Sequence, residues 1–367
     1  MQRGGAEMRT LEVMRSLRPL GFICDVVALS GLAGELDTEI EALGGRVHFC
    51  RRTFGWRRHL RRILRSGGYT VVHSHVHLYS GILLREAAHC GIPIRIAHFR
   101  STGDGRGNNL VRRCYRWLMT RLIDRHATAI LSVSRSALTA AWPRPTDARC
   151  QVIYNGLDLK VFSRELDVLA LRADIGVPVG AGRVVMHVGN FTQPKNHGFL
   201  LRVFAALAKK DQSLYLILVG RGGTIEEQQT RALIEEFSLG GQVKILGVRD
   251  DVPDLLRCAD VFLFPSVREG LPGALLEACA AGLPCVTSDI PSCREVAERV
   301  PGVDCVGLDQ PVSVWVERLQ RGLASGRASD PQAGSRHLIQ GGFDLDTATE
   351  ALRRAWTVPV VMRSGHP

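Results

Sequence analysis

Long apolar runs are missing from this sequence of 367 residues, and so is a hydrophobic N-terminal segment. No apolar run reaches the roughly 18 residues that a membrane-spanning helix needs. The opening residues, MQRGGAEMRTLEVM, lack the apolar core of a secretory signal. We therefore expect a cytoplasmic protein that does not span the membrane.

Closely spaced cysteine pairs are missing as well. The ten cysteines are scattered along the chain, and no two of them form a C-x-x-C pair. The spacing of a zinc ribbon or a redox pair is thus absent, and we interpret the cysteines as reduced thiols. Hydrophobic residues make up 45% of the chain and charged residues 23%, which is typical of a globular protein.

Lysine is scarce, with five residues in the whole chain, whereas arginine is abundant and unevenly placed. Residues 51–150 contain 19 arginines, no lysine and four acidic residues. The net charge of this window is therefore +15, against +11 for the whole chain. A surface of this kind attracts anionic partners, which are acidic lipid, a phosphorylated acceptor or nucleic acid.

Short β-rich apolar runs alternate with amphipathic helical stretches, a pattern that predicts an α/β fold with parallel sheets. The predicted strands of the first half are residues 23–29, 46–49, 70–74, 94–98 and 129–133. Those of the second half are residues 184–188, 214–219, 243–246, 261–264 and 285–287. The predicted helices include residues 7–17, 117–124, 135–141, 199–209, 225–237, 273–280 and 344–356.

The two series of strands predict two domains, because the chain is longer than one typical domain. We expect an N-terminal domain over residues 1–160, a turn-rich linker over 161–182 and a second domain over 183–340. The remaining residues, 341–367, are predicted to form a helix that crosses back, followed by a tail. Because an open α/β domain normally opens with a strand and this sequence opens with a glycine turn, we expect its first strand to be absent.

The most informative stretch is FPSVREGLPGALLEACAAGLPCVT, residues 264–287. A predicted strand ends there, a Gly-Pro turn follows, and then a helix begins, which is where open α/β sheets bind ligands and where backbone N–H groups bind phosphate. Glu269 and Glu277 are separated by seven residues and could accept hydrogen bonds from the hydroxyls of a sugar and a ribose. Taken alone, the two glutamates are compatible with an exposed helix; the strand, turn and helix together favour a ligand site.

Three histidines, His73, His75 and His77, lie at the end of a predicted strand and alternate, so that one face could hold all three. A metal site is one interpretation, but we favour cleft lining or core packing and predict no metal. The GRGG segment that begins at Gly220 is not the dinucleotide fingerprint, and we interpret it as a contact to a nucleotide base.

Residues 51–65 carry seven arginines together with aromatic and aliphatic side chains. Such a segment is typical of an element that lies on an anionic membrane surface. A solvated helix face is the plain alternative. No nucleic-acid-binding motif accompanies the charge, so we predict no nucleic-acid partner.

These features come together in a resemblance. The E-x7-E pattern after FPS and before AAGLPCV resembles the signature of the family 4 retaining glycosyltransferases. Other segments are similar to that family in the same order: RGGAE at 3–7, VIYNGLD at 152–158, HVGNFTQPKNH at 187–197 and LGVRDDVPDLL at 246–256. HSHVHLYSG at 73–81 and RIAHFRST at 95–102 most resemble members that build capsular or exopolysaccharides. The resemblance implies the GT-B fold, in which two Rossmann-like domains face each other across a cleft.

The resemblance also implies roles for single residues of the second domain. Glu269 would contact the donor sugar, and Glu277 the ribose hydroxyls. Lys195 would neutralise the diphosphate, whose growing negative charge must be stabilised as it leaves. The remaining donor-binding residues implied are Gly270, Leu271, Pro272, Gly220, Arg221, Arg249 and Arg268.

One position departs from the family, because Asn190 stands where an arginine is usual. Arg249 or Arg268 could supply the missing phosphate-binding cation. In the first domain, Gly4 and Gly5 match an acceptor-side loop close to the donor phosphates. His98 matches a histidine that lines the catalytic cleft, so the implied catalytic set is His98 with Glu269 and Lys195.

The expected function is metal-independent retaining transfer of a sugar from a UDP- or GDP-sugar to a glycan or a lipid-linked glycan. The nucleotide sugar is a co-substrate, and no cofactor is expected. We expect the protein to lie on the inner face of the membrane as a peripheral protein. The alternatives are a non-catalytic nucleotide-sugar-binding protein and, less favoured, a nucleotide-sugar epimerase.

Overall fold

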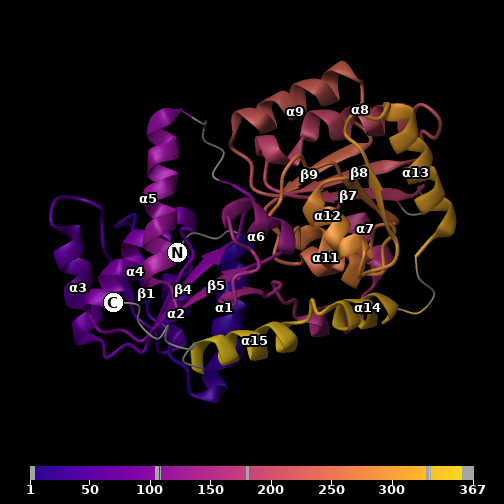
Figure 1. Cartoon of the computed structure of the whole chain (residues 1–367). Helices are drawn as coiled ribbons and strands as arrows, with labels where there is room; N and C mark the ends of the chain where they lie inside the picture. The colour runs from indigo at the N-terminus through magenta and orange to yellow at the C-terminus, as the bar shows by residue number, and fades with distance from the viewer. Residues whose placement is uncertain are drawn as a thin grey trace. The chain divides into compact units, whose positions relative to one another are not determined.

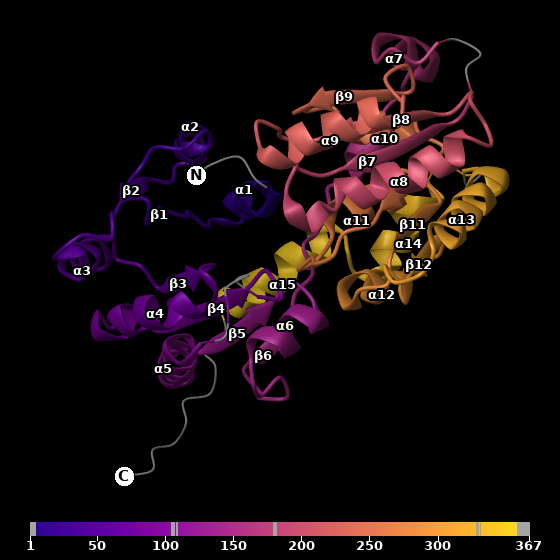
Figure 2. The same cartoon turned by 90° about the horizontal axis from the view of Figure 1, so that it is seen from above.

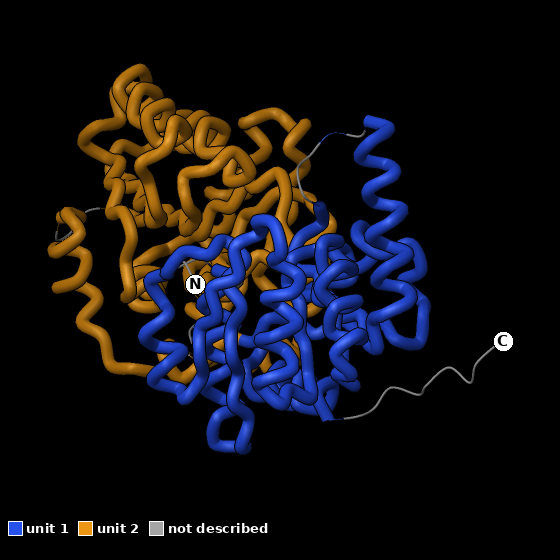
Figure 3. The backbone as a smooth tube through the Cα atoms, turned by 90° about the vertical axis from the view of Figure 1, so that its left-hand side faces the viewer, with its two compact units in different colours: residues 1–156, 344–367 blue, residues 157–343 orange. Residues whose placement is uncertain are grey.

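The computed structural model describes residues 5–103, 107, 109–178, 182–327, 330 and 332–357. The chain forms two compact units, which Figure 3 colours separately. Unit 1 contains residues 1–156 and 344–367, and unit 2 contains residues 157–343. The segment 161–182, which the sequence predicts as a linker, belongs to unit 2 and contains a short helix. None of the helices described is long and apolar enough to cross a membrane.

Unit 2 is built on a six-stranded sheet in the order β12-β11-β10-β7-β8-β9, with every pair parallel. The strands are β7 (Val184–Val188), β8 (Tyr215–Val219), β9 (Val243–Gly247), β10 (Val261–Phe264), β11 (Cys285–Ser288) and β12 (Val303–Val306). The sequence predicted five of them and missed β12. This strand is at the edge of the sheet and carries Asp304, so it lacks the apolar run of a central strand.

Helices connect these strands (Figure 1). Thr224 caps α9, because its side chain accepts a hydrogen bond from the N–H of Glu227. The helices of unit 2 are η3 (Leu159–Ser163), α7 (Val168–Asp174), η4 (Gln193–Lys195), α8 (His197–Ala208), α9 (Ile225–Glu236), α10 (Val252–Arg257), α11 (Gly273–Ala280), α12 (Pro291–Ala297), α13 (Val312–Ser325) and α14 (Ala333–Gly341).

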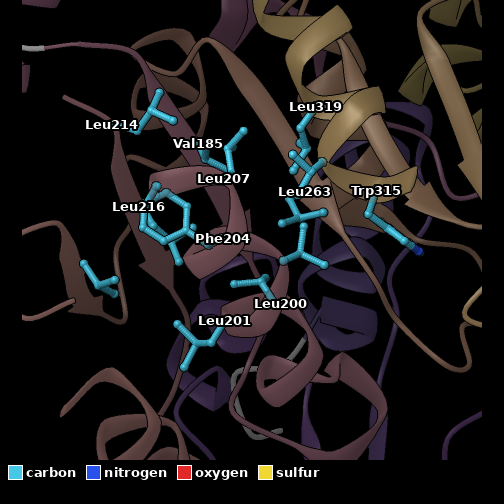
Figure 4. Packing of buried hydrophobic residues seen from close by; sticks show 14 of the residues in the cluster. Val185, Leu200, Leu201, Phe204, Leu207, Leu214, Leu216, Leu263, Trp315 and Leu319 are labelled. Carbon is cyan, nitrogen blue, oxygen red and sulfur yellow. The ribbon is translucent and has the colours of Figure 1, made fainter. Parts of the chain in front are cut away.

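The main core of unit 2 lies between one face of the sheet and helices α8 and α13. Figure 4 shows this cluster, with Leu200 and Phe204 of α8, Leu263 of β10, and Trp315 and Leu319 of α13; all five side chains are buried. Alternate strand residues point to the opposite face, which α11 covers through its contacts with β10 and β11. A sheet covered on both faces holds the ends of its strands rigidly, and those ends carry the loops described below.

Unit 1 holds two parallel sheets instead of one: a pair, β1-β2, and a ladder, β3-β4-β5-β6. Figure 2 shows the pair apart from the ladder. The strands are β1 (Val26–Ala28), β2 (Val47–Phe49), β3 (Val71–Ser74), β4 (Ile94–Phe99), β5 (Ala129–Ser132) and β6 (Cys150–Val152). The sequence missed β6, a three-residue edge strand.

Helices cover both faces of the ladder in unit 1. Phe99 packs with Met119 and Ile123 of α5 on one face, and Ile96 packs with Leu352 of α15 on the other. The final helix therefore belongs to unit 1, where it also contacts α1. The helices are α1 (Gly5–Leu17), η1 (Arg18–Leu20), α2 (Asp37–Ala42), α3 (Trp56–Ser66), η2 (His77–Tyr79), α4 (Ser80–His89), α5 (Leu110–His126), α6 (Arg135–Ala141) and α15 (Leu345–Thr357).

Candidate functional site

The strand order of unit 2 reverses between β7 and β10. From β7 the chain proceeds through β8 to β9 on one side, and then crosses to β10, β11 and β12 on the other. In open α/β sheets the loops at such a switch point diverge and leave room for a ligand. The loop after β7 contains Lys195, and the loop after β10 contains Glu269.

These two side chains meet. Lys195 Nζ lies 2.7 Å from Glu269 Oε1, and the side chains are 20% and 14% exposed. Lys195 Nζ also lies 4.8 Å from the centre of the Phe264 ring, at the end of β10. An ion pair that is partly shielded but still reachable can exchange its internal partner for the phosphates and hydroxyls of a ligand.

Backbone hydrogen bonds hold the two loops against each other. The N–H of Val267 donates to the carbonyl of Pro194 at 2.8 Å. Asn196 has a left-handed backbone (φ 57°), and its amide donates to the carbonyl of Pro265 at 3.2 Å. These hydrogen bonds, which we call the loop frame, hold the two loops together independently of the Lys195–Glu269 ion pair.

A third loop, after β8, joins this frame through Gly220. Its φ is +157°, and a Cβ at this position would lie 2.1 Å from the carbonyl oxygen of Gly189. The side chain of Asn190 accepts a hydrogen bond from the N–H of Arg221 at 2.9 Å. Asn190, which the sequence marked as a missing arginine, thus ties the loop after β7 to the loop after β8.

The two arginines considered as replacements for that cation differ. Arg249 binds Asp251 through Nε at 2.8 Å and through a terminal nitrogen at 2.6 Å, so its charge is already engaged. Arg268 is exposed in the loop after β10 and forms no ion pair among the residues that the structure describes. Arg268 is the better candidate to contact a phosphate.

Helix α11 begins at Gly273, without a side-chain cap, directly after the loop that carries Glu269. Leu271 and Pro272 are buried and fix the start of the helix. The uncapped N–H groups at such a start attract phosphate. Glu277 is half-buried on the second turn, as its spacing from Glu269 predicted.

Two buried histidines beneath this site were missed as functional candidates. His187 on β7 donates from Nδ1 to the carbonyl of Leu263 at 2.9 Å, so its Nε2 is unprotonated. Burial holds the pKa of His187 well below 6.5 and lowers the pKa of His197 to about 4, with the charge of Lys195 acting in the same direction. Both residues stand in the HVGNFTQPKNH segment, which was the available signal.

In unit 1 the histidines gather differently from the prediction. One ring nitrogen from each of His73, His75 and His98 lies within 4.8 Å of the other two. His77 does not join them, because β3 ends at Ser74 and His77 begins η2, where its ring stands edge-on to Phe99. The predicted row of three on one strand face is therefore wrong, and His98 takes the third place.

Hydrogen bonds set the tautomers of this cluster. The indole N–H of Trp356 donates to Nδ1 of His73 at 3.1 Å, so neutral His73 carries its proton on Nε2. That N–H reaches Nδ1 of His98 at 3.0 Å, which leaves the proton of His98 on Nε2. His98 Nε2 is buried without a partner among the described residues. His98 therefore keeps one N–H donor that no described residue uses.

Burial keeps the pKa of His98 well below 6.5 and lowers that of His73 to about 3, and the charge of Arg100 acts in the same direction on both. Three neutral imidazoles can bind a transition metal. The hydrogen-bond chain already uses the nitrogens between His73 and His98, and the guanidinium of Arg100 repels a dication. The arrangement therefore favours a hydrogen-bonding role over a metal site.

Of the predicted acceptor-side glycines, Gly4 lies outside the described residues. Gly5 begins α1, and a Cβ placed on it would meet no atom within 4 Å. No internal contact of the described chain therefore requires glycine at position 5, and its predicted role near a ligand stays a prediction.

The basic segment 51–65 forms a turn followed by α3. Leu60, Ile63 and Leu64 are buried in the core of unit 1, so their apolar surface does not face solvent. Phe54 is fully exposed in the turn. The segment is thus a basic helix face with one apolar side chain at its start, and it lacks the apolar stripe of a membrane-surface helix.

Helix α5 carries such a stripe, and the sequence analysis missed it. Leu110, Val111, Trp117 and Leu118 are 46–78% exposed, and Cys114 between them is also exposed. Their spacing places them on one face of the helix. The signal was present as an apolar period, but a period alone does not tell which face of a helix the core covers.

Two family models match the chain. The model described as Glycosyltransferase Family 4 matches residues 3–161, and the model described as Glycosyl transferases group 1 matches residues 182–320.

Curated relatives match most of the chain. The "Putative glycosyltransferase EpsF" of Bacillus subtilis is 30% identical over 98% of this chain and 94% of its own length. The "Capsular polysaccharide biosynthesis glycosyltransferase CapH" of Staphylococcus aureus is 30% identical over 81% of each chain. The Escherichia coli "UDP-Gal:alpha-D-GlcNAc-diphosphoundecaprenol alpha-1,3-galactosyltransferase" is 29% identical over 63% of this chain and 60% of its own.

Among solved structures, Anabaena Alr3699/HepE in complex with UDP and glucose has a TM-score of 0.77 at 18% identity, covering 96% of this chain and 97% of its own.

Proposed function

Because this chain belongs to glycosyltransferase family 4 and has the GT-B fold, we propose that it transfers a hexose from a nucleotide sugar to a glycan or lipid-linked glycan, with retention of anomeric configuration. The chain is a glycosyltransferase of polysaccharide or glycan biosynthesis. The donor, the stereochemistry and the independence from metal are the proposed part.

The pairing of Lys195 with Glu269 at the switch point of unit 2 is the observation that carries the proposal. A sugar diphosphate needs a cation for its phosphates and an acceptor for its hydroxyls, and this pair supplies both on one rigid frame. The start of α11 adds backbone N–H groups, and Glu277 on the same helix is placed for the ribose hydroxyls. The loop at Gly220 and Arg221 is assigned to the nucleotide base.

In the proposed reaction the bond between the anomeric carbon and the diphosphate oxygen breaks. The acceptor hydroxyl attacks from the same face, and its proton passes to the leaving phosphate. Lys195 stabilises the charge that grows on the diphosphate. Glu269 accepts a hydrogen bond from a hydroxyl of the sugar and fixes its orientation.

UDP-sugars are the donors to test first, since the Escherichia coli relative is named for UDP-Gal and HepE was crystallised with UDP. Thermal denaturation of the protein with UDP- and GDP-sugars should show stabilisation by one base, because a ligand of the folded state raises its stability. Transfer to lipid-linked acceptors is then followed by proton NMR of the new anomeric centre. Formation of the opposite anomer would refute retention.

Peripheral association with an anionic membrane on its cytoplasmic side is also proposed. The apolar stripe of α5 would enter the lipid interface while the arginines of α3 face the headgroups. Both helices pack against α4, so they belong to one layer of unit 1. This reassigns the apolar part of the predicted membrane element from residues 51–65 to α5.

A further inference from the structure

Unit 1 contains a hollow of about 500 Å³ at the carboxyl ends of its first three strands. Leu29 and Ser30 follow β1, Arg51 and Arg52 follow β2, and Tyr79 ends the short helix after β3. Trp56, the first residue of α3, completes the lining. The carboxyl ends of parallel strands are where α/β domains bind ligands, and the function proposed above assigns nothing to this place.

Close packing of two loops forms the wall of the hollow. Gly31 has a φ of +71°, and a Cβ on it would lie 2.5 Å from Cβ of Arg51. The chain after β1 is thus packed directly against the chain after β2, and only glycine allows the approach. The turn that carries the arginines is closed by hydrogen bonds from the N–H of Thr53 to the carbonyl of Arg51 and from that of Trp56 to Thr53.

The aromatic side of the hollow is ordered by stacking. The rings of Trp56 and Tyr79 stack with centres 6.1 Å apart. The guanidinium of Arg52 lies 5.1 Å from the centre of the Tyr79 ring. Such cation–π contact holds an arginine without neutralising it, so Arg52 is positioned and still charged.

Neither Arg51 nor Arg52 pairs with a carboxylate in the part of the chain that the structure describes. Both arginines are exposed, whereas the less exposed Arg149 of the same unit pairs with Asp124 and Asp147. Among the described residues, those that line the hollow include no acidic side chain. Two adjacent guanidinium groups without an internal counter-charge are suited to a group with two or more negative charges, and their fork geometry matches phosphate.

We propose that this hollow binds the acceptor through a phosphate or diphosphate on its reducing end, which Arg51 and Arg52 hold while Trp56 and Tyr79 pack against the adjoining sugar ring. The inference rests on the proposed function, because it names the class of acceptor. Aromatic walls with a few charged groups are typical of sites for small polar molecules. A bare, uncharged oligosaccharide would leave both arginines without a partner.

Pyrophosphate is the first probe, titrated calorimetrically into the full-length Lys195→Ala protein so that the donor site contributes less binding. We expect Arg51→Ala/Arg52→Ala in this background to weaken pyrophosphate binding by about tenfold or more, since a charged hydrogen-bonding partner is lost at each position. Arg58→Ala/Arg62→Ala is the matched control. It removes the same charge from exposed positions of α3 outside the hollow and should change the affinity by less than about twofold. Equal losses in both pairs, or no loss in the first, would overturn the proposal.

The sugar contact is tested with glucose 1-phosphate against inorganic phosphate. Tyr79→Leu should weaken the sugar phosphate several-fold more than phosphate; equal weakening would overturn the stacking part. A soluble source and a lipid-borne source are distinguished by comparing glucose 1-phosphate in solution with vesicles that display a glycosyl diphosphate lipid. Binding of the soluble compound as tightly as pyrophosphate supports a free sugar phosphate, and preference for these vesicles over the same vesicles without the glycosyl diphosphate lipid supports a lipid-linked acceptor.

Stabilisation by UDP-sugar separates this inference from the proposed function. Arg51→Ala/Arg52→Ala should keep the stabilisation by the donor and raise KM for the acceptor. If no nucleotide sugar stabilises the wild-type protein but pyrophosphate binds through these arginines, the proposed function is refuted and the phosphate site in the hollow is supported. If a nucleotide sugar stabilises the protein and the double variant keeps its pyrophosphate affinity, only the proposed phosphate site in the hollow is refuted.

Discussion

The loops at the carboxyl ends of the strands differ between the two units in how their cations are held. In unit 2, Lys195 is already paired with Glu269 on a hydrogen-bonded frame. In unit 1, Arg51 and Arg52 line a hollow without a carboxylate partner among the described residues. A paired cation is held in one place and binds a ligand by exchange, which favours orientation. An unpaired cation attracts charge from a distance and tolerates variation in what carries it.

The sheets of the two units also differ in continuity. The six strands of unit 2 form one continuous parallel sheet, whereas the strands of unit 1 form a pair and a separate ladder. A rigid edge suits a site that must align a sugar with its leaving group. In the functions proposed above, unit 2 holds the group that is transferred, while unit 1 binds an anionic acceptor and an anionic surface.

The role of unit 2 in this comparison is tested most strongly by removing the carboxylate of Glu269. We expect Glu269→Ala to lower kcat by about a hundredfold to a thousandfold, the range seen when one group that stabilises a transition state is deleted. Release of nucleoside diphosphate in the presence of acceptor measures it. Glu235→Ala, an exposed glutamate of α9, is the control and should leave kcat unchanged. Near-normal turnover in Glu269→Ala, with the fold intact, would refute the assigned role.

The apolar stripe of α5 tests the recruiting role of unit 1. Trp117→Ser/Leu118→Ser removes two exposed apolar side chains and should lower binding to vesicles that contain anionic lipid by about tenfold or more, since each buried side chain contributes on the order of 1 kcal/mol or more. Flotation of vesicles measures the bound fraction. Leu169→Ser, at an exposed position of unit 2, is the control. Unchanged binding in the α5 variant would return the membrane role to the arginines alone.

Gly220 tests whether the frame of unit 2 sets the affinity for the donor. A Cβ at this position would lie 2.1 Å from the carbonyl oxygen of Gly189, so Gly220→Ala must push apart the loops after β7 and β8. We expect donor affinity to fall by about tenfold, because backbone strain of this kind costs about 1–3 kcal/mol. Gly241→Ala, where a Cβ meets nothing within 4 Å, is the control. Titration of the nucleotide sugar decides, and equal affinity in both variants would show that the loops can adjust.

Much of unit 2 was predictable from its sequence. Strand β10 is a continuous apolar run, and β7 is apolar apart from His187. A Gly-Pro turn with a following helix locates Glu269 and the start of α11 from the local sequence alone. The pairing of Lys195 with Glu269 was not predictable, because it depends on the strand order. Residues 74 positions apart meet only when β7 and β10 lie side by side.

Unit 1 was less predictable, for a physical reason. The charge window 51–150 was visible, but its division into a core-facing α3 and a solvent-facing apolar stripe on α5 depends on what packs against each helix. The hollow at Arg51 was hidden because its lining comes from three strand ends. His98 joined His73 for the same reason, through the pairing of β3 with β4.

The smallest expected effect is that of buried histidines on the pH dependence of stability, and both units contain such histidines. His197 of unit 2 has a folded-state pKa of about 4, below the unfolded value near 6.5. Between these values the unfolded chain binds the extra proton, so this contribution to stability is present above pH 6.5 and is lost as the pH falls towards 4. His197→Phe keeps the stacking on Phe191 and should make the free energy of unfolding less sensitive to acid, by about 1–2 kcal/mol between pH 7 and pH 5. Urea denaturation at the two pH values measures the difference, with the exposed His59→Gln as control. If His197→Phe keeps the full wild-type acid sensitivity, other buried histidines must account for it, such as His187 of unit 2, whose pKa burial holds well below 6.5, and His73 of unit 1, whose folded-state pKa is about 3.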